Sequence, residues 1–95
     1  MRNITAMRNA GADKAGVERF TKAMHAKMTA KRAEGRGGWH RAHRGCGDVE
    51  TYGCSVVGLQ QALRNHIKRG LTGDNLVDVA NFCMMVWNRE HPNGK

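Results

Sequence analysis

The residues with the most distinctive chemistry lie between Glu34 and Gly47, where arginines, histidines and one tryptophan are interleaved with glycines. Glycine lets a backbone approach a ligand closely, and guanidinium groups bind phosphate through paired N–H donors. An aromatic ring among such groups can stack on a base. No Gly-Lys-Ser/Thr ending is present, which excludes a P-loop. The pattern favours a phosphate-bearing, base-containing ligand, with these candidate residues: Arg36, Gly37, Gly38, Trp39, His40, Arg41 and Arg44. The alternative is a solvated loop whose Trp39 fills the core.

The same segment contains possible metal ligands, because two histidines and two cysteines follow one another as H-x2-H-x2-C-x7-C. These are His40, His43, Cys46 and Cys54. Structural zinc sites usually contain closely spaced C-x2-C pairs, which this segment lacks. Its three arginines would also repel a dication, so we do not expect zinc.

A second candidate lies in the apolar stretch 73–87, where Asp78 stands between two valines. One helical stripe is apolar and wide enough to bury: Leu76, Val79, Ala80, Cys83, Val86 and Trp87. Another stripe is mostly polar: Asp78, Asn81, Met85 and Asn88. A carboxylate in apolar surroundings needs a partner. We therefore expect Asp78 to meet a basic side chain, a helix N-terminus, a metal or a ligand.

Three helices would position these groups. The first is expected from Asp13 to about Ala33, after a flexible arm over residues 1–12. Its buried stripe would be Val17, Phe20, Met24 and Met28. Its basic residues would form a solvated face, which comprises Lys22, Lys27, Lys31 and Arg32.

The second helix is expected from about Ser55 to Arg69, with a stop at Gly70. Its apolar stripe is Val56, Leu59, Leu63 and Ile67. His66 borders that stripe, where an interhelical contact is the expected role, and Lys68 follows among the last cations. Both residues are also candidates for binding the ligand. Asp74 or Thr72 would cap the third helix, and residues 91–94 would end it. The sequence thus predicts a single all-α domain over 13–92, a helical hairpin crossed by an N-terminal helix.

The composition of the chain indicates what kind of partner it binds and in which compartment. The chain has 95 residues and a formal charge of +8, which points to an anionic partner. No run reaches the roughly twenty apolar residues of a membrane span. An odd cysteine count without a secretion signal suggests a reducing cytoplasm. Two Trp, one Tyr and two Phe give little core, so we expect a homo-oligomer.

Three segments carry a family resemblance: 31–39 (KRAEGRGGW), 63–70 (LRNHIKRG) and 77–85 (VDVANFCMM). Over about residues 19–89 the chain resembles small tailed-phage proteins of the all-α MazG-like dATP/dGTP pyrophosphohydrolase class. The resemblance implies nucleoside triphosphate binding, with Mg²⁺ held by E-x-x-E and E-x-x-D pairs. This chain has Asn75 and Asp78 at the second pair, and its second helix offers Gln60 and Gln61 instead of carboxylates. The resemblance therefore suggests that a nucleotide-binding shape persists while hydrolysis is lost.

The leading hypothesis is a phage-encoded, cytoplasmic, non-catalytic protein that sequesters a nucleotide or nucleotide-derived signal, as a counter-defence protein would. Arginines would hold phosphates, Trp39 would stack on a base, and Asp78 with Asn81 would orient a polar edge or anchor an arginine. One alternative is a Mg²⁺-dependent MazG-like pyrophosphohydrolase in which Asp74 and Asp78 of neighbouring subunits share a metal. Another is a basic protein that binds nucleic acid or a host protein. No cofactor is expected outside the enzyme alternative.

Overall fold

The computed structural model describes residues 4–36, 38–40, 55–91 and 93–94. Over these residues the chain forms three α-helices and no strand: α1 (Ile4–Ala33), α2 (Val56–Lys68) and α3 (Gly73–Glu90). The all-α prediction is confirmed for this part of the chain. None of these helices combines the length and apolarity that a bilayer span requires.

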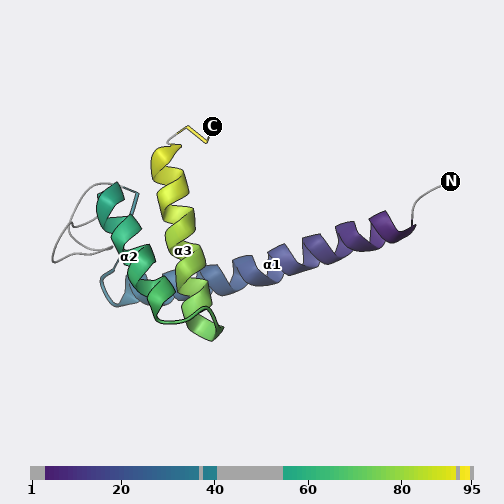
Figure 1. Cartoon of the computed structure of the whole chain (residues 1–95), viewed down its shortest axis with the longest axis horizontal. Coiled ribbons are helices and arrows are strands. Elements are labelled where there is room, and N and C mark those ends of the chain that lie inside the picture. Colours follow the sequence, from purple (N-terminus) through teal and green to yellow (C-terminus); the bar gives the residue numbers. More distant parts are fainter. Residues whose placement is uncertain (1–3, 37, 41–54, 92, 95) are drawn as a thin grey trace.

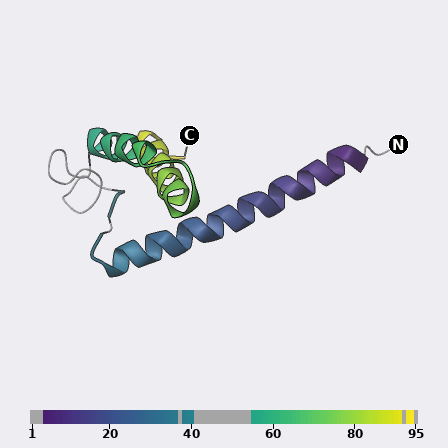
Figure 2. The same ribbon diagram turned by 60° about the horizontal axis from the view of Figure 1, so that its bottom comes forward.

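α3 is the central element, because it packs against both α2 and α1. Figure 1 shows α2 and α3 side by side, with α1 crossing them near its own C-terminal end. Turned by 60°, the molecule shows α1 running past one side of the α2–α3 pair, with its N-terminal part projecting well beyond it (Figure 2). The molecule measures 57 × 30 × 25 Å, because a helix of 30 residues is about 45 Å long.

The hairpin of α2 and α3 is fixed by contacts at its ends. The Ser55 hydroxyl accepts a hydrogen bond from the Gly58 amide at 3.0 Å and caps α2. α2 ends before Gly70, whose φ of +113° suits glycine. Of the two candidate caps, Thr72 occupies the N-cap position of α3, but its side chain makes no capping hydrogen bond. The Asn75 side chain donates to the carbonyls of His66 (2.6 Å) and Gly70 and thereby ties α3 to the end of α2.

α1 begins at Ile4, and the predicted start at Asp13 is wrong. Residues 4–14 are all exposed, so tertiary burial does not explain this extension. Ala6, Ala10 and Ala12 are strong helix formers, and the helix continues through Gly11, which is a weak one. Asp13 therefore lies inside the helix and does not cap it. The flexibility of residues 1–12 stays a prediction.

The buried residues differ from the predicted stripes. In α1, Val17 is 65% and Phe20 39% exposed, because α3 meets only the later part of the helix. In α3, Leu76 is 41% and Trp87 50% exposed, while the buried residue of the helix is Asn81, at 5% exposure. α1 packs on the polar side of α3, against Asp78 and Asn81. α2 packs on a neighbouring side, against Phe82 and Asn75. The prediction that the apolar stripe is buried is therefore wrong for Leu76 and Trp87. In α2, Leu59 is completely buried as predicted, whereas Ile67 of the same stripe is 44% exposed.

Candidate functional site

The first polar cluster lies where α1 crosses α3. The Nζ of Lys27 lies 3.4 Å from Oδ1 of Asp78, and the two side chains are 27% and 18% exposed. Asp78 therefore has the basic partner that its surroundings demanded. That partner comes from α1, and the prediction that Lys27 belongs to a fully solvated face is wrong.

One turn further along α3, Asn81 makes the second contact. Its side-chain amide donates to the Met24 carbonyl at 3.3 Å, and the residue is 5% exposed. Met24 precedes Lys27 by three positions, as Asp78 precedes Asn81, so both pairs lie on facing sides of the two helices. Asn81 Oδ1 is buried and accepts no hydrogen bond from any described residue. We name these four residues the α1–α3 junction: Met24, Lys27, Asp78 and Asn81.

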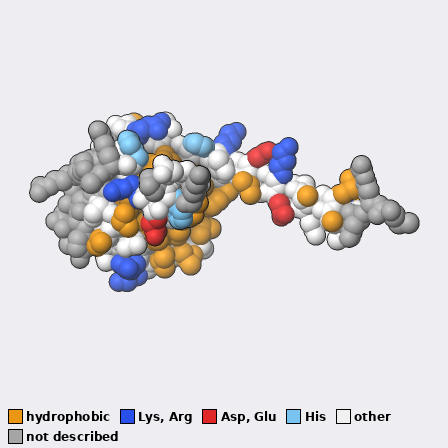
Figure 3. Space-filling model, turned by 90° about the horizontal axis from the view of Figure 1, so that it is seen from above, with side chains coloured by type: hydrophobic (Ala, Val, Ile, Leu, Met, Phe, Trp, Pro, Cys, Tyr) orange, Lys and Arg blue, Asp and Glu red, His pale blue; other side chains and the backbone are white. Residues whose placement is uncertain are grey.

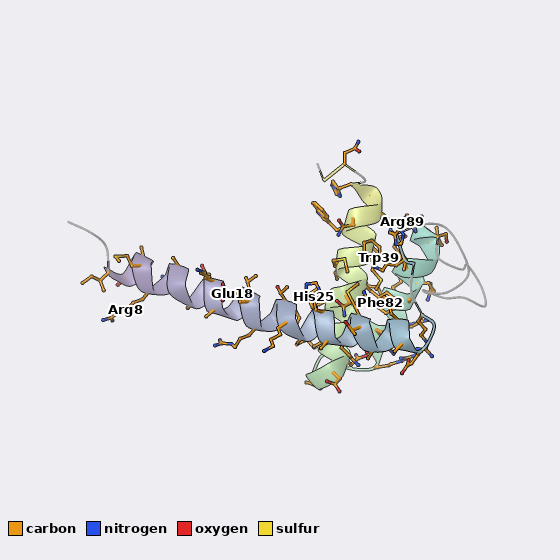
Figure 4. All side chains as sticks on the ribbon, turned by 180° about the vertical axis from the view of Figure 1, so that it is seen from behind. Arg8, Glu18, His25, Trp39, Phe82 and Arg89 are labelled. Atoms are coloured by element: carbon orange, nitrogen blue, oxygen red, sulfur yellow. The ribbon has the colours of Figure 1, made fainter. Side chains whose placement is uncertain are left out.

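The start of the glycine-rich segment lies at a different place. Arg89, in the last turn of α3, donates from Nη1 to the Trp39 carbonyl at 3.0 Å. The half-buried Trp39 ring meets His40 edge-on, with ring centres 6.0 Å apart. Gly35 (φ +85°) and Gly38 (φ +77°) provide the turns that lead the chain there from α1. In Figure 4, Trp39 and Arg89 lie together near the α2–α3 pair, far from Arg8 on α1.

The described residues do not bring Trp39 to Asp78. Arg89 follows Asp78 by about three turns of α3, which is about 16 Å along the helix axis. Arg36 and Lys68 are exposed, and neither forms an ion pair with a described carboxylate. Gly37, Arg41 and Arg44 lie outside the described residues. The idea that α3 forms the floor of a site covered by the arginine segment therefore stays a prediction.

His66 is an interhelical contact. Its Nδ1 lies 2.9 Å from the Ala62 carbonyl, which can only accept, so Nδ1 carries a proton. Nε2 lies 3.3 Å from Nη1 of Arg69, and the ring packs on Phe82 with centres 4.8 Å apart. Both ring nitrogens and one ring face are thus engaged within the α2–α3 pair, which leaves little of His66 for a ligand.

No three His, Cys, Asp or Glu side chains of the described residues gather closely enough to hold a metal. Asp74 is exposed in the first turn of α3, and Asp78 already faces an ammonium group. Of the possible zinc ligands only the exposed His40 is described, since His43, Cys46 and Cys54 lie outside. Residues that fit Mg²⁺ would have to come from a second subunit or from residues 41–54.

Sequence reasoning missed Lys27 and Arg89 as members of these clusters. A signal existed for Lys27, which follows Met24 by three positions and so borders the apolar side of its helix. For Arg89 no sequence signal was present, because a cation in a last helical turn is common on dipole grounds alone.

Comparison with known proteins gave no match: no family model, no curated protein and no solved structure matches the chain. The resemblance to the MazG-like class stays a prediction that rests on the three segments quoted above.

Proposed function

We propose that this protein binds a phosphate-bearing nucleotide without hydrolysing it. The observation that carries the proposal is the Lys27–Asp78 ion pair. Metal-dependent pyrophosphohydrolysis requires several carboxylates aimed at Mg²⁺. Here the one carboxylate retained from the expected metal-binding helix is neutralised by a lysine of the same chain. Ligand phosphates would then be neutralised by protein cations directly.

Cations that could neutralise the ligand's phosphates lie at the C-terminal end of α1 and just after it. No ion pair links Lys31, Arg32 or Arg36 to a described carboxylate, although Arg32 contacts the Thr29 hydroxyl at 3.4 Å. Arg32 and Arg36 are exposed, and the next residues in sequence include Arg41 and Arg44. Guanidinium groups bind phosphate in a bidentate manner, and Trp39 supplies a ring for a base. Sequestration of a nucleotide-derived signal in a phage-infected cell is the biological role that fits this chemistry.

A second candidate, nucleic-acid binding, is favoured by the side of α1 that faces away from α3. With about 100° between successive residues, that side carries five exposed cations and one acid, Glu18. The cations are Arg8, Lys14, Arg19, Lys22 and Arg32. A straight basic helix face suits a row of backbone phosphates, whose binding would weaken steeply with salt.

Calorimetry in EDTA tests both candidates with one protein. The titrants are nucleoside triphosphates, cyclic dinucleotides, NAD-derived molecules, and a single-stranded and a duplex DNA. Nucleotide binding predicts saturable heat with one small titrant, which Arg36→Gln weakens at least about tenfold, a loss of about 1.4 kcal/mol. The matched control, Arg8→Gln, removes an equally exposed arginine from the far part of α1 and leaves that affinity unchanged.

If the protein instead binds DNA, and if Arg8→Gln weakens and salt abolishes that binding, the result would support nucleic-acid binding over nucleotide binding. Mg²⁺-dependent pyrophosphate release that Asp78→Asn abolishes would establish the enzyme alternative. Absence of heat with every titrant would overturn both binding proposals.

A further inference from the structure

The side of α3 that faces away from α1 is apolar, and neither α1 nor α2 covers it, although His91 stacks on the Trp87 ring with ring centres 4.4 Å apart. Four residues spaced by four, three and four positions define this outer face: Leu76, Ala80, Cys83 and Trp87. Leu76, Cys83 and Trp87 are exposed, and Ala80 is partly exposed. Between Asn75 and Asn88 the only charged residue is Asp78, which contacts Lys27 on the other side. An uncharged stripe of this kind on a basic, polar chain marks an interaction surface.

The helices of one copy do not cover this face. Trp87 lies about 180° around α3 from Asp78, and Cys83 about 160° from Asn81, so α1 packs on the opposite side. α2 packs on a third side, through Phe82 against His66 and Asn75 against the end of α2. In the space-filling view, hydrophobic side chains gather on the compact end of the molecule, whereas the projecting part of α1 carries scattered side chains of mixed type (Figure 3).

We propose that two copies of the chain pair through this outer face, with their α3 helices antiparallel. A two-fold axis between Asn81 and Phe82 places Leu76 opposite the partner's Trp87. The same axis places Ala80 opposite the partner's Cys83. The small side chains at the centre let the helices approach closely, and the large ones close the ends of the contact.

The charges at the helix ends agree with this pairing. Glu90, the last residue of α3, lies at the edge of the outer face and comes to the N-terminal turn of the other copy's helix. A carboxylate is favourable at that end because the helix dipole is positive there. Asp74, which would repel Glu90, lies on the side of α3 that faces α1, away from this contact. The absence of charge along the stripe gives an acidic or basic partner nothing to pair with.

The contact is short. Leu76 and Trp87 are about 16 Å apart along α3, so we expect the pair to bury less than the roughly 1,200–2,000 Å² typical of stable complexes. We expect a weak dimer that dissociates on dilution. It does not depend on the proposed ligand, since the outer face includes none of the residues assigned to nucleotide binding.

Cross-linking tests the geometry directly. In a Cys46→Ser/Cys54→Ser background, Cys83 is the only thiol and is exposed. A short bismaleimide should join two Cys83 thiols rapidly, since each lies next to the two-fold axis. The matched control adds Cys83→Ser and Val57→Cys, which moves the thiol to a residue that is 52% exposed on α2. We expect cross-linking of the control to be at least about tenfold slower.

Sedimentation equilibrium over a range of concentrations gives the second readout. Ala80→Glu buries a charge at the centre of the contact and should raise the dissociation constant at least about tenfold. Val57→Glu adds the same charge on α2 and should leave it unchanged, and circular dichroism checks that both variants fold. A wild-type protein that stays monomeric, a dimer that survives Ala80→Glu, or equal cross-linking of the two thiols would overturn the proposal.

Discussion

Asn81 offers a direct test of how the α1–α3 junction is built. It is the one polar residue among the described residues that is buried as deeply as the core, and it makes one side-chain hydrogen bond, to the Met24 carbonyl. Asn81→Leu keeps the number and branching of side-chain heavy atoms and removes both polar groups. The expected result is a protein of equal or greater stability, which is unusual for a change at a buried position.

The magnitude follows from two terms. Loss of the 3.3 Å hydrogen bond costs about 0.5–1.5 kcal/mol. Removal of Oδ1, a buried acceptor without a donor among the described residues, returns about 1–3 kcal/mol. The Met24 carbonyl lies inside α1, where the helix itself supplies a donor. The net expectation is a gain of about 1 kcal/mol, which raises Tm by about 4–8 °C in a domain of this size.

Urea and thermal unfolding of wild type, Asn81→Leu and Asn81→Ala provide the assay. Asn81→Ala loses the same hydrogen bond and also leaves a space, so it should be less stable than the leucine variant by about 2 kcal/mol or more. If Asn81→Leu instead loses more than about 1 kcal/mol, Oδ1 has a donor in the folded protein and the reasoning is refuted.

Three further changes test the packing by urea unfolding. Leu59→Ala should lose about 2–5 kcal/mol, because Leu59 is fully buried in a small core, and a loss below 1 kcal/mol would contradict that placement. Lys27→Met should lose about 1–3 kcal/mol by leaving the Asp78 carboxylate unpaired at 18% exposure, and the double variant with Asp78→Asn should recover part of this loss. Ser55→Ala should lose about 1 kcal/mol with faster amide exchange at Gly58, whereas unchanged exchange would argue against the cap.

Helix identity and most helix ends could be predicted from local sequence. Apolar residues at helical spacing marked α2 and α3, and Ser55 and Gly70 marked the ends of α2 through capping and positive φ. The start of α1 could not be predicted in this way, because Ile4–Ala12 contains neither a clear cap nor an apolar stripe. There, the alanines favour a helix and Gly11 disfavours it, so the sequence does not mark where the helix begins.

The side of α3 that packs inward could not be derived from hydrophobicity. Either the apolar stripe through Leu76 and Trp87 or the stripe of Asp78 and Asn81 could face the other helices. The sequence shows only that one side of α3 must be buried. α1 supplies a lysine and a backbone carbonyl that match the second stripe, and this pairing depends on how two distant helices cross. The need of Asp78 for a partner was predictable from burial cost, but the identity of that partner was not.

The most direct test of the central claim is calorimetric titration of nucleotides into the protein with and without Mg²⁺. The account predicts saturable binding in EDTA and loss of affinity when Arg36 is replaced by glutamine. After long incubation the nucleotide should remain intact, with no pyrophosphate released. Binding that requires Mg²⁺, accompanied by release of pyrophosphate, would contradict the proposal that the protein binds a nucleotide without hydrolysing it.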